Sequence, residues 1–387
     1  MKSDRSHFRT LTALFAAGIL VALPLHAQPR KSGEGKRPST ESGPKPTMSF
    51  EDYNPDSMLK APGKEITRAK FPFVDAHNHQ RRHSPSSLAE VVREMDAMNM
   101  AIMVNLSGGS GQALKDQVAL TERVAPGRFV AFANLNFDGI DDPDWASRAA
   151  AQLERDVEEG GARGLKIFKN LGMTLRDKAG KRIPTNDRRF DPVWAKAGEL
   201  GIPVLIHTGE PPAFFLPVDG KNERWLELTL HPSRGRFGDD VPDFPTLMNE
   251  QHEIFRRHPK TTFINAHLGW YGNDLGHLGK LMDEMPNMVT ELGAVIYELG
   301  RQPRFAREFF LKYQDRILIG KDSWVPSEYK TYFRVLESAD EYFPYHKKYH
   351  AFWAMYGLDL PDDVLKKVYY QNALRVIPGL DRSRFPR

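Results

Sequence analysis

Cysteine is absent from the 387 residues, which excludes a disulfide framework and a thiolate zinc site. Any metal ion bound by this chain must therefore be held by imidazole nitrogen and by oxygen. A Gly-rich phosphate loop is missing after the first predicted strand, which weighs against a dinucleotide-binding sheet. What is present is the composition of a globular protein, with 40% hydrophobic and 27% charged residues.

The predicted folded domain carries almost no net charge. The formal net charge of the chain is +4, to which residues 1–27 contribute +2 and residues 28–46 contribute +3, leaving −1 for the rest. Because the basic charge lies outside the predicted fold, we expect no nucleic-acid partner.

No apolar run is long enough to be read as a membrane-spanning helix. Basic residues precede an apolar segment at 11–25, and the small residue Ala27 stands at a suitable cleavage point. This layout predicts a signal peptide over 1–27, export to the periplasm or secretion, and no stable membrane span after cleavage. An anchor that is never cleaved is the alternative. Residues 28–46 are rich in Pro, Gly, Ser and Lys without apolar residues, which predicts a disordered linker before a single domain at 47–387.

Short apolar runs alternate with amphipathic helical segments from residue 71 onward. The apolar runs are 71–77, 100–106, 128–136, 162–168, 202–207, 261–266, 287–295 and 316–320, and the helical stretches are 86–98, 111–124, 143–159, 191–200, 245–257, 274–285 and 304–313. Eight such units in roughly 250 residues predict an α/β fold of the (β/α)8 TIM-barrel type. An open doubly wound sheet is the alternative. Residues 325–387 are expected to continue as helix over the outside or the bottom of the barrel.

Polar residues at the carboxyl ends of the predicted strands are the candidates for an active site, because catalytic groups of such barrels lie at that face. They are His77 and His79 on the first strand, Lys166 on the fourth, His207 on the fifth, His267 on the sixth and Asp322 on the eighth. Two imidazoles one residue apart point to the same side of a strand and form half of a metal site. A single strand-end histidine is usually structural, whereas this whole set indicates one shared site.

These residues lie in motifs that resemble the amidohydrolase superfamily, in particular the amidohydrolase-related group that includes aminocarboxymuconate-semialdehyde decarboxylase and related lactonases. The resemblance covers about 71–377. The motifs that carry it are VDAHNH (74–79), DPVWAKAGELGIPVLIHTGEP (191–211), INAHLG (264–269), RILIGKDS (316–323) and YYQNALRVI (369–377).

The resemblance implies a metal-dependent mechanism with assigned residues. His77, His79, His207 and Asp322 would hold one divalent metal ion, usually zinc, and His267 would contact the metal-bound water or the substrate. Such a ligand set leaves a position open for water, whose pKa the metal lowers to about 7. Asp322 is expected to take the proton of that water as a general base, and protonated His267 to stabilise the developing oxyanion.

The number of metal ions stays open at Lys166. In binuclear relatives a lysine at this position is carboxylated and bridges two metals, and the residue matching His267 binds the second one. In mononuclear relatives a basic residue near this position holds a substrate carboxylate, and one metal ion is the interpretation favoured here.

Three further residues near the expected mouth of the site receive structural interpretations. Lys321 precedes Asp322 and is expected to point to the opposite side of the strand. Glu210 and Glu291 are expected to pair with nearby Arg and Lys.

Two predicted loops supply candidates for substrate binding. Residues 80–85 carry Arg81 and Arg82 directly after the histidine pair, and the insertion at 211–244 carries Trp225, Arg234 and Arg236. This cationic and aromatic mixture suits a small-molecule substrate that is anionic or bears a ring.

We therefore expect an exported metal-dependent hydrolase that uses an activated water on an amide, ester or lactone carbonyl. A non-oxidative decarboxylase (a carboxy-lyase) is the alternative, because both share the ligand set. A third hypothesis is an exported binding protein whose metal site only holds a ligand. A homo-oligomer is compatible with the sequence.

Overall fold

We describe the chain from a computed structural model, over residues 47–80, 83–238, 240–350 and 353–386. The predicted signal peptide at 1–27, the predicted linker at 28–46, and Arg81 and Arg82 lie outside the described residues. Within the described ranges, no helix is both long and apolar enough to cross a membrane.

The core of the fold is a barrel of parallel strands. These are β1 (Phe73–Asn78), β2 (Met100–Asn105), β3 (Phe129–Ala131), β4 (Ala133–Asn134), β5 (Leu165–Ile167), β6 (Val204–Ile206), β7 (Phe263–Asn265), β8 (Met288–Glu291) and β9 (Ile317–Leu318). Only Phe132 separates β3 from β4, so these two segments act as one strand, and the strands follow one another in chain order around the sheet. The ring closes where the Ala76 amide donates to the Ile319 carbonyl at 2.9 Å, beside a parallel bridge between Asn78 and Asp322. The predicted TIM barrel is confirmed.

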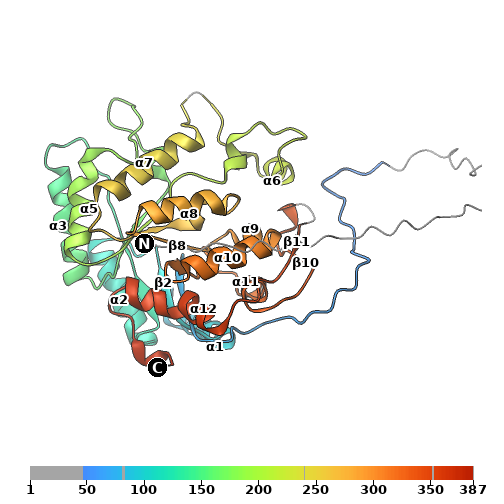
Figure 1. The fold of residues 1–387 in the computed structure, drawn as a ribbon. Helices are drawn as coiled ribbons and strands as arrows, with labels where there is room; N and C mark the ends of the chain where they lie inside the picture. Colours follow the sequence, from blue (N-terminus) through green and yellow to red (C-terminus); the bar gives the residue numbers. More distant parts are fainter. Residues whose placement is uncertain (1–46, 81–82, 239, 351–352, 387) are drawn as a thin grey trace, which may run out of the picture. The chain divides into compact units, whose positions relative to one another are not determined.

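Helices surround this barrel in the alternation that the sequence predicts (Figure 1). They are α1 (Pro85–Met98), α2 (Gly111–Val124), α3 (Trp145–Glu158), α4 (Asn170–Met173), α5 (Asp191–Glu199), α6 (Trp225–Leu230), α7 (Phe244–Arg257), α8 (Leu275–Glu284), α9 (Ile296–Arg301), α10 (Pro303–Tyr313), α11 (Tyr329–Glu337), α12 (Asp362–Lys366) and α13 (Asn372–Val376). The first helix begins at a capping box, in which Ser84 and Ser87 each satisfy a backbone amide of the other.

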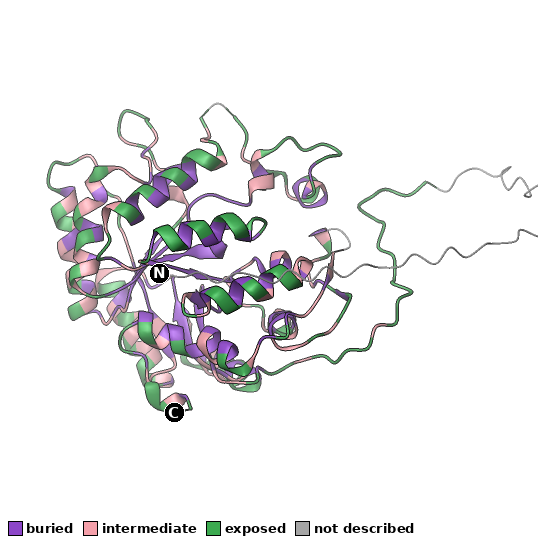
Figure 2. Ribbon diagram, viewed as in Figure 1, coloured by how far each residue is buried: buried purple, intermediate pink, exposed green. Residues whose placement is uncertain are grey.

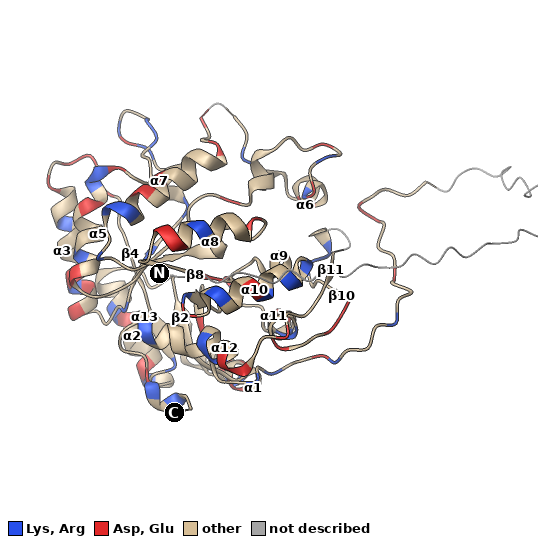
Figure 3. Cartoon of the chain, viewed as in Figure 1, with Lys and Arg blue, Asp and Glu red and all other residues tan. Residues whose placement is uncertain are grey.

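Several of the outer helices alternate between buried and exposed residues along their length (Figure 2). In α10 the buried residues are Ala306, Phe309, Phe310 and Tyr313, a spacing of three and four residues that places them on one face. All six residues of β1 are buried, as expected for a strand that is covered on both sides. Lys, Arg, Asp and Glu are interspersed over the outward faces of these helices (Figure 3).

The prediction for the C-terminal region is wrong in part. Helical structure is present in α11 and again from α12 to α13, which are joined by a π-turn at Lys367–Gln371. Between them the chain forms the hairpin of β10 (Phe343–Pro344) and β11 (Ala354–Met355). This hairpin region does not pack at the bottom of the barrel, because Lys347, Tyr349 and His350 line a cavity together with residues that follow β6, β7 and β8. The aromatic residues of this region suggested buried helix faces, but the same residue types also suit a segment that folds over the carboxyl ends of the strands.

Candidate metal centre and its surroundings

His77, His79 and Asp322 meet where β1 and β9 close the barrel. The Oδ1 atom of Asp322 lies 3.4 Å from Nε2 of His77 and 3.6 Å from Nε2 of His79. The amide of Asp322 donates to the His77 carbonyl at 2.6 Å, and its φ of 77° lies in the left-handed region. A strained backbone of this kind persists where surrounding contacts fix it, and such positions cluster at functional sites. The three ligand atoms lie within 4.8 Å of one another and could hold a metal ion.

His267 stands on an unusual turn after β7. His267, Leu268, Gly269 and Trp270 all have positive φ, so the chain makes a left-handed turn directly after the strand. This turn brings the His267 ring to 4.8 Å from that of His77 and 4.4 Å from that of His207, measured between ring centroids. The four predicted histidines therefore form a continuous row, although His207 does not belong to the tight group with Asp322.

Hydrogen bonds fix the tautomers in this row. Nδ1 of His267 lies 2.7 Å from the Gly293 carbonyl, which can only accept, so Nδ1 carries the proton. In the neutral ring, Nε2 of His267 is then an acceptor for the Nδ1 proton of His207 at 3.3 Å. This leaves a lone pair on Nε2 of His207, which is buried and has no hydrogen-bond partner among the described residues. Nε2 of His77 is likewise buried without one. Nε2 of His77 lies beside the Asp322 carboxylate, and unpaired imidazole nitrogens of this kind are donors that a divalent ion such as zinc prefers.

Glu291 has a different role from the one expected. Its carboxylate does not pair with Arg or Lys but accepts from Nδ1 of His77 at 2.8 Å, and from the amides of His267 and Gly293. A carboxylate behind a ligating histidine fixes the ring and its tautomer. His77, His267 and Glu291 also form a compact group of potential ligands, but Nδ1 of His77 is already engaged by Glu291 there. The signal that could have found this role is that Glu291 ends a buried strand.

Burial sets the protonation of the histidines. Burial, followed by the charge of His77, lowers the pKa of His79 to about 3. Burial also lowers the pKa of His267, and that of His207 falls well below its ordinary value. For His77 burial is outweighed by the Glu291 carboxylate, so its pKa is raised. Three of the imidazoles are therefore neutral at neutral pH, which is the form that binds metals.

Two other charged groups complete the centre. Burial raises the pKa of the Asp322 carboxyl, but His77 outweighs this effect and the pKa lies well below its ordinary value. Lys166 is 1% exposed, and its Nζ has no hydrogen-bond partner among the described residues. Burial lowers its pKa to about 8, against the attraction of Asp322 and Glu291. The neighbouring Phe168 ring lies 5.4 Å from this Nζ and 5.6 Å from the His79 ring.

The interpretations of Lys321 and Glu210 are confirmed. Lys321 turns away from the metal candidates and pairs with Glu328 at 2.6 Å. Glu210 pairs with Lys169 and Arg236, each at 2.5 Å.

The predicted substrate-binding residues separate into two groups. Arg234 and Arg236 line a cavity of about 180 Å³ next to Trp270, whose ring stacks on that of His267 at 4.5 Å. Trp225 does not line this cavity, and its ring instead lies 5.7 Å from that of Phe50.

The sequence did not predict a buried hydrogen-bond network that lines the same cavity. Arg224 donates to Glu227 at 2.6 Å and to the Tyr297 hydroxyl at 2.8 Å, and it lies 3.0 Å from Nε2 of His350. Its guanidinium also lies within 5.7 Å of the ring centroids of Phe214, Tyr297 and Trp353. These residues come from three distant parts of the chain, and no local pattern marks them as neighbours.

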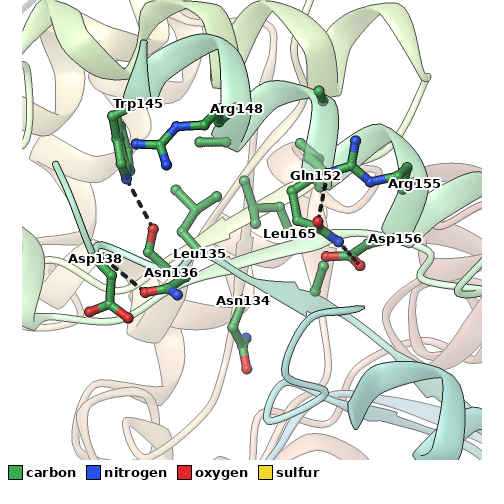
Figure 4. A pocket seen from close by; sticks show the side chains of 14 residues that line it. Asn134, Leu135, Asn136, Asp138, Trp145, Arg148, Gln152, Arg155, Asp156 and Leu165 are labelled. Atoms are coloured by element: carbon green, nitrogen blue, oxygen red, sulfur yellow. Dashed lines mark hydrogen bonds between the residues drawn. The ribbon is translucent and has the colours of Figure 1, made fainter. Parts of the chain in front are cut away.

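A larger cavity, of about 360 Å³, lies elsewhere, between α3 and the strands β4 and β5 (Figure 4). Trp145, Gln152 and Asp156 line it from the helix, and the Gln152 amide donates to Asp156 at 2.8 Å. Its described lining residues include neither the strand-end histidines nor Asp322, so it is not the candidate site.

Comparison with known proteins shows which family the chain matches. The profile of the amidohydrolase family matches residues 44–379, whereas the search of curated proteins finds no match. The solved structure of 2,6-dihydroxybenzoate decarboxylase from Rhizobium is similar, with a TM-score of 0.51 and 16% identity over 79% of this chain and 98% of that one. A dihydroxybenzoic acid decarboxylase from a Polaromonas species, solved with manganese and the inhibitor 2-nitroresorcinol, has a TM-score of 0.50 and 16% identity over 79% of this chain and 96% of that one. At these identities the likeness shows the fold.

A TIM barrel that gathers histidines and a carboxylate at the carboxyl ends of its strands defines a class of metal-dependent enzymes. The chain belongs to the amidohydrolase family, because the family profile covers most of its length.

Proposed function

We propose that this enzyme is a metal-dependent carboxy-lyase that removes carbon dioxide from an aromatic or unsaturated acid. The observation that carries the proposal is the buried ammonium of Lys166, which has no hydrogen-bond partner among the described residues and lies beside the metal candidates. A buried cation without a partner is costly, and a substrate carboxylate would stabilise it. The Phe168 ring, 37% exposed and between Lys166 and His79, offers a surface for an unsaturated ring.

The comparisons support this choice over hydrolysis. The two structures named above are both decarboxylases of dihydroxybenzoates, and one of them binds a divalent metal.

In the proposed mechanism, His77, His79, His207 and Asp322 hold one divalent ion, and we expect zinc. Such an ion supplies a Lewis acid for a substrate oxygen. Lys166, protonated at neutral pH, binds and orients the carboxylate that leaves. The bond between that carboxyl carbon and the ring breaks, carbon dioxide departs, and the electron pair left on the ring carbon takes a proton. We assign the relay of this proton to His267. Its Nδ1 keeps its own proton on the Gly293 carbonyl, so Nε2 takes up a proton from solvent and passes it to the ring carbon.

Hydrolysis of an ester, amide or lactone is the second candidate, and one observation favours it. The pKa of Asp322 is held well below its ordinary value, by His77 against the effect of burial, so its carboxylate stays ionised. An ionised carboxylate next to the metal candidates can accept a proton from a water as a general base.

Product analysis separates the two candidates. The purified metal-loaded enzyme is incubated in heavy water with hydroxylated benzoates and, separately, with a panel of esters and lactones. We expect one carbon dioxide per turnover of a benzoate and one deuterium at the carbon that carried the carboxyl group. Cleavage of esters or lactones with no carbon dioxide from any acid would replace the proposal by the second candidate. The binding-protein hypothesis would gain support if the enzyme converted neither the benzoates nor the esters and lactones but still bound one of them.

We also propose that residues 1–27 direct export and are then removed. The support is the sequence layout alone. Mass spectrometry of the protein recovered from the periplasm or medium should show a chain that begins near Gln28. Recovery of the full-length chain from the cytoplasm would contradict this.

A further inference from the structure

The cavity next to Trp270 is adjacent to the candidate metal centre, and none of the proposed metal ligands lines it. Trp270 connects the two places, because its ring stacks on His267 and lies 5.6 Å from the ring of His207 while it also lines the cavity. Ala294, which follows the Gly293 carbonyl that anchors His267, lines the cavity as well. A molecule bound at the histidines could therefore extend into this cavity.

The charges that line the cavity are unbalanced. The lining contains two carboxylates, Glu210 and Glu227, and five cationic side chains, which are Lys169, Arg224, Arg234, Arg236 and Lys347. Each carboxylate is shared by two cations, Glu210 by Lys169 and Arg236, and Glu227 by Arg224 and Arg234. Lys347 forms no ion pair with any residue that the structure describes. The cavity thus has an excess of positive charge within a partly enclosed space, which favours an anion.

Buried donors in the lining also lack partners. Nε of Arg236 and Nε1 of Trp270 have no hydrogen-bond partner among the described residues, and neither has Nδ1 of His350. Trp270 is 8% exposed and His350 is 4% exposed, so bulk water has little access to them. Buried polar groups are normally paired, and these unpaired groups lie behind the surface of the cavity, where their N–H dipoles add to its preference for an anion.

We propose that this cavity binds a second acidic group of the substrate, so that the preferred substrate is a diacid with one carboxylate at the metal centre and a compact oxyanion here. The inference rests on the proposed function, because it assigns the far end of the same substrate. Lys347, Arg236 and Lys169 bind the second acid, while Arg224 is held in place by Glu227 and Tyr297 and keeps the floor of the cavity positive.

The test compares matched acids that differ by one carboxylate. Binding of isophthalate and benzoate, and of biphenyl-4,4′-dicarboxylate and biphenyl-4-carboxylate, is measured by titration calorimetry with the full metal-loaded enzyme. We expect at least one diacid to bind tenfold or more tightly than its monoacid. Arg236→Gln and Lys347→Gln should each reduce this preference at least threefold and leave monoacid binding unchanged. The matched control Arg256→Gln, which removes an exposed arginine paired with Glu284 on the outside of the barrel, should keep the full preference.

Two results would overturn the inference. One is that both diacids bind no more tightly than their monoacids, and the other is that the cavity variants weaken monoacid and diacid binding equally. Because binding is measured without turnover, the outcome is independent of the proposed reaction. A diacid preference without any release of carbon dioxide would refute the carboxy-lyase and retain this anion site. Release of carbon dioxide without a diacid preference would retain the carboxy-lyase and refute the anion site.

Discussion

Nδ1 of His77 lies 2.8 Å from Oε1 of Glu291, and both side chains are fully buried. The same carboxylate receives the amide of His267, so one residue of β8 orients a side chain of β1 and the backbone of the turn after β7. Burial alone would raise the pKa of Glu291, but His77 outweighs burial and the pKa falls to about 2. Glu291 is thus an ionised carboxylate that orients two of the candidate residues.

Replacing Glu291 by Gln should weaken metal binding, because the neutral amide no longer supports the basicity and tautomer of His77. We expect a loss of about 10- to 100-fold in metal affinity. Metal content after dialysis against a graded chelator series measures this. Glu210→Gln is the matched control, since Glu210 pairs with Lys169 and Arg236 and not with a histidine, and it should retain the metal. Equal metal loss in both variants would contradict the assigned role.

Removal of the metal should abolish turnover. The buried Nε2 atoms of His77 and His207 are the donors that an ion would take up, and His207→Ala should lower the metal content by itself. Elemental analysis of the purified enzyme is expected to give one ion per chain, and readdition of zinc after chelation should restore activity. Full activity in metal-free protein would exclude the mechanism, and a ratio near two would favour the binuclear alternative at Lys166.

Lys166→Met should separate activity from stability. It removes a buried ammonium that has no partner among the described residues, so we expect stability to stay the same or to rise, while turnover falls about 100-fold or more. Lys321→Met is the matched comparison, because Lys321 is equally buried but pairs with Glu328. That variant should lose about 1–3 kcal/mol, because Glu328 is partly exposed and keeps its contact with His346. Urea unfolding and steady-state kinetics of both proteins test the contrast, and retained turnover in Lys166→Met would remove Lys166 from the mechanism.

Gly269→Ala should damage the turn that carries His267 and Trp270. The φ of Gly269 is +59°, and an added Cβ would lie 2.2 Å from Nδ2 of Asn265. A left-handed alanine costs about 1–2 kcal/mol, and the clash adds about 1–3 kcal/mol. Gly201→Ala is the control, since its φ of +65° is similar and no atom lies within 4 Å of its Cβ position. The control should lose only the backbone contribution in urea unfolding and keep its activity. Equal stability losses in the two variants would show that the clash is absorbed.

Stability should fall as the solution becomes mildly acidic, and His252 should account for part of the loss. Burial, followed by Arg256, lowers the pKa of His252 to about 3. In the unfolded chain this ring takes up a proton near pH 6.5, whereas in the folded protein it stays neutral down to about pH 3. The free energy of unfolding therefore decreases as the pH falls below 6.5, and it continues to decrease towards pH 3. Between pH 6.5 and 5.5 this histidine alone should cost about 1 kcal/mol.

The variant His252→Phe should remove that share of the slope and keep the ring that stacks on Tyr271 at 6.2 Å. Urea unfolding at pH 8.0, 6.5 and 5.5 provides the measurement. Above pH 7 the stability of the variant relative to the wild type should be constant. An unchanged slope below pH 6.5 would show that His252 is not the group that titrates.

The sequence by itself determined the barrel and the positions of the strand-end residues. Each strand is short and covered on both sides, so it reads as an apolar run, and each helix shows its buried stripe in the local spacing. His77 and His79 could be paired because an extended strand alternates its side chains. The resemblance then supplied the roles of His207, His267 and Asp322, and the barrel explains why their positions at strand ends bring them together.

Only the tertiary structure decided which carboxylate serves His77, which cations face the cavity and where the hairpin region lies. Glu291 and His77 are 214 residues apart, and Arg224 and His350 are 126 apart. A charged side chain takes its partner from whatever the fold places within hydrogen-bond distance, and at such separations no periodicity in the sequence records that choice. The left-handed turn at His267 is hidden for the same reason, because Glu291 at the end of β8 and Gly293 after it hold His267 in a conformation that its own side chain disfavours.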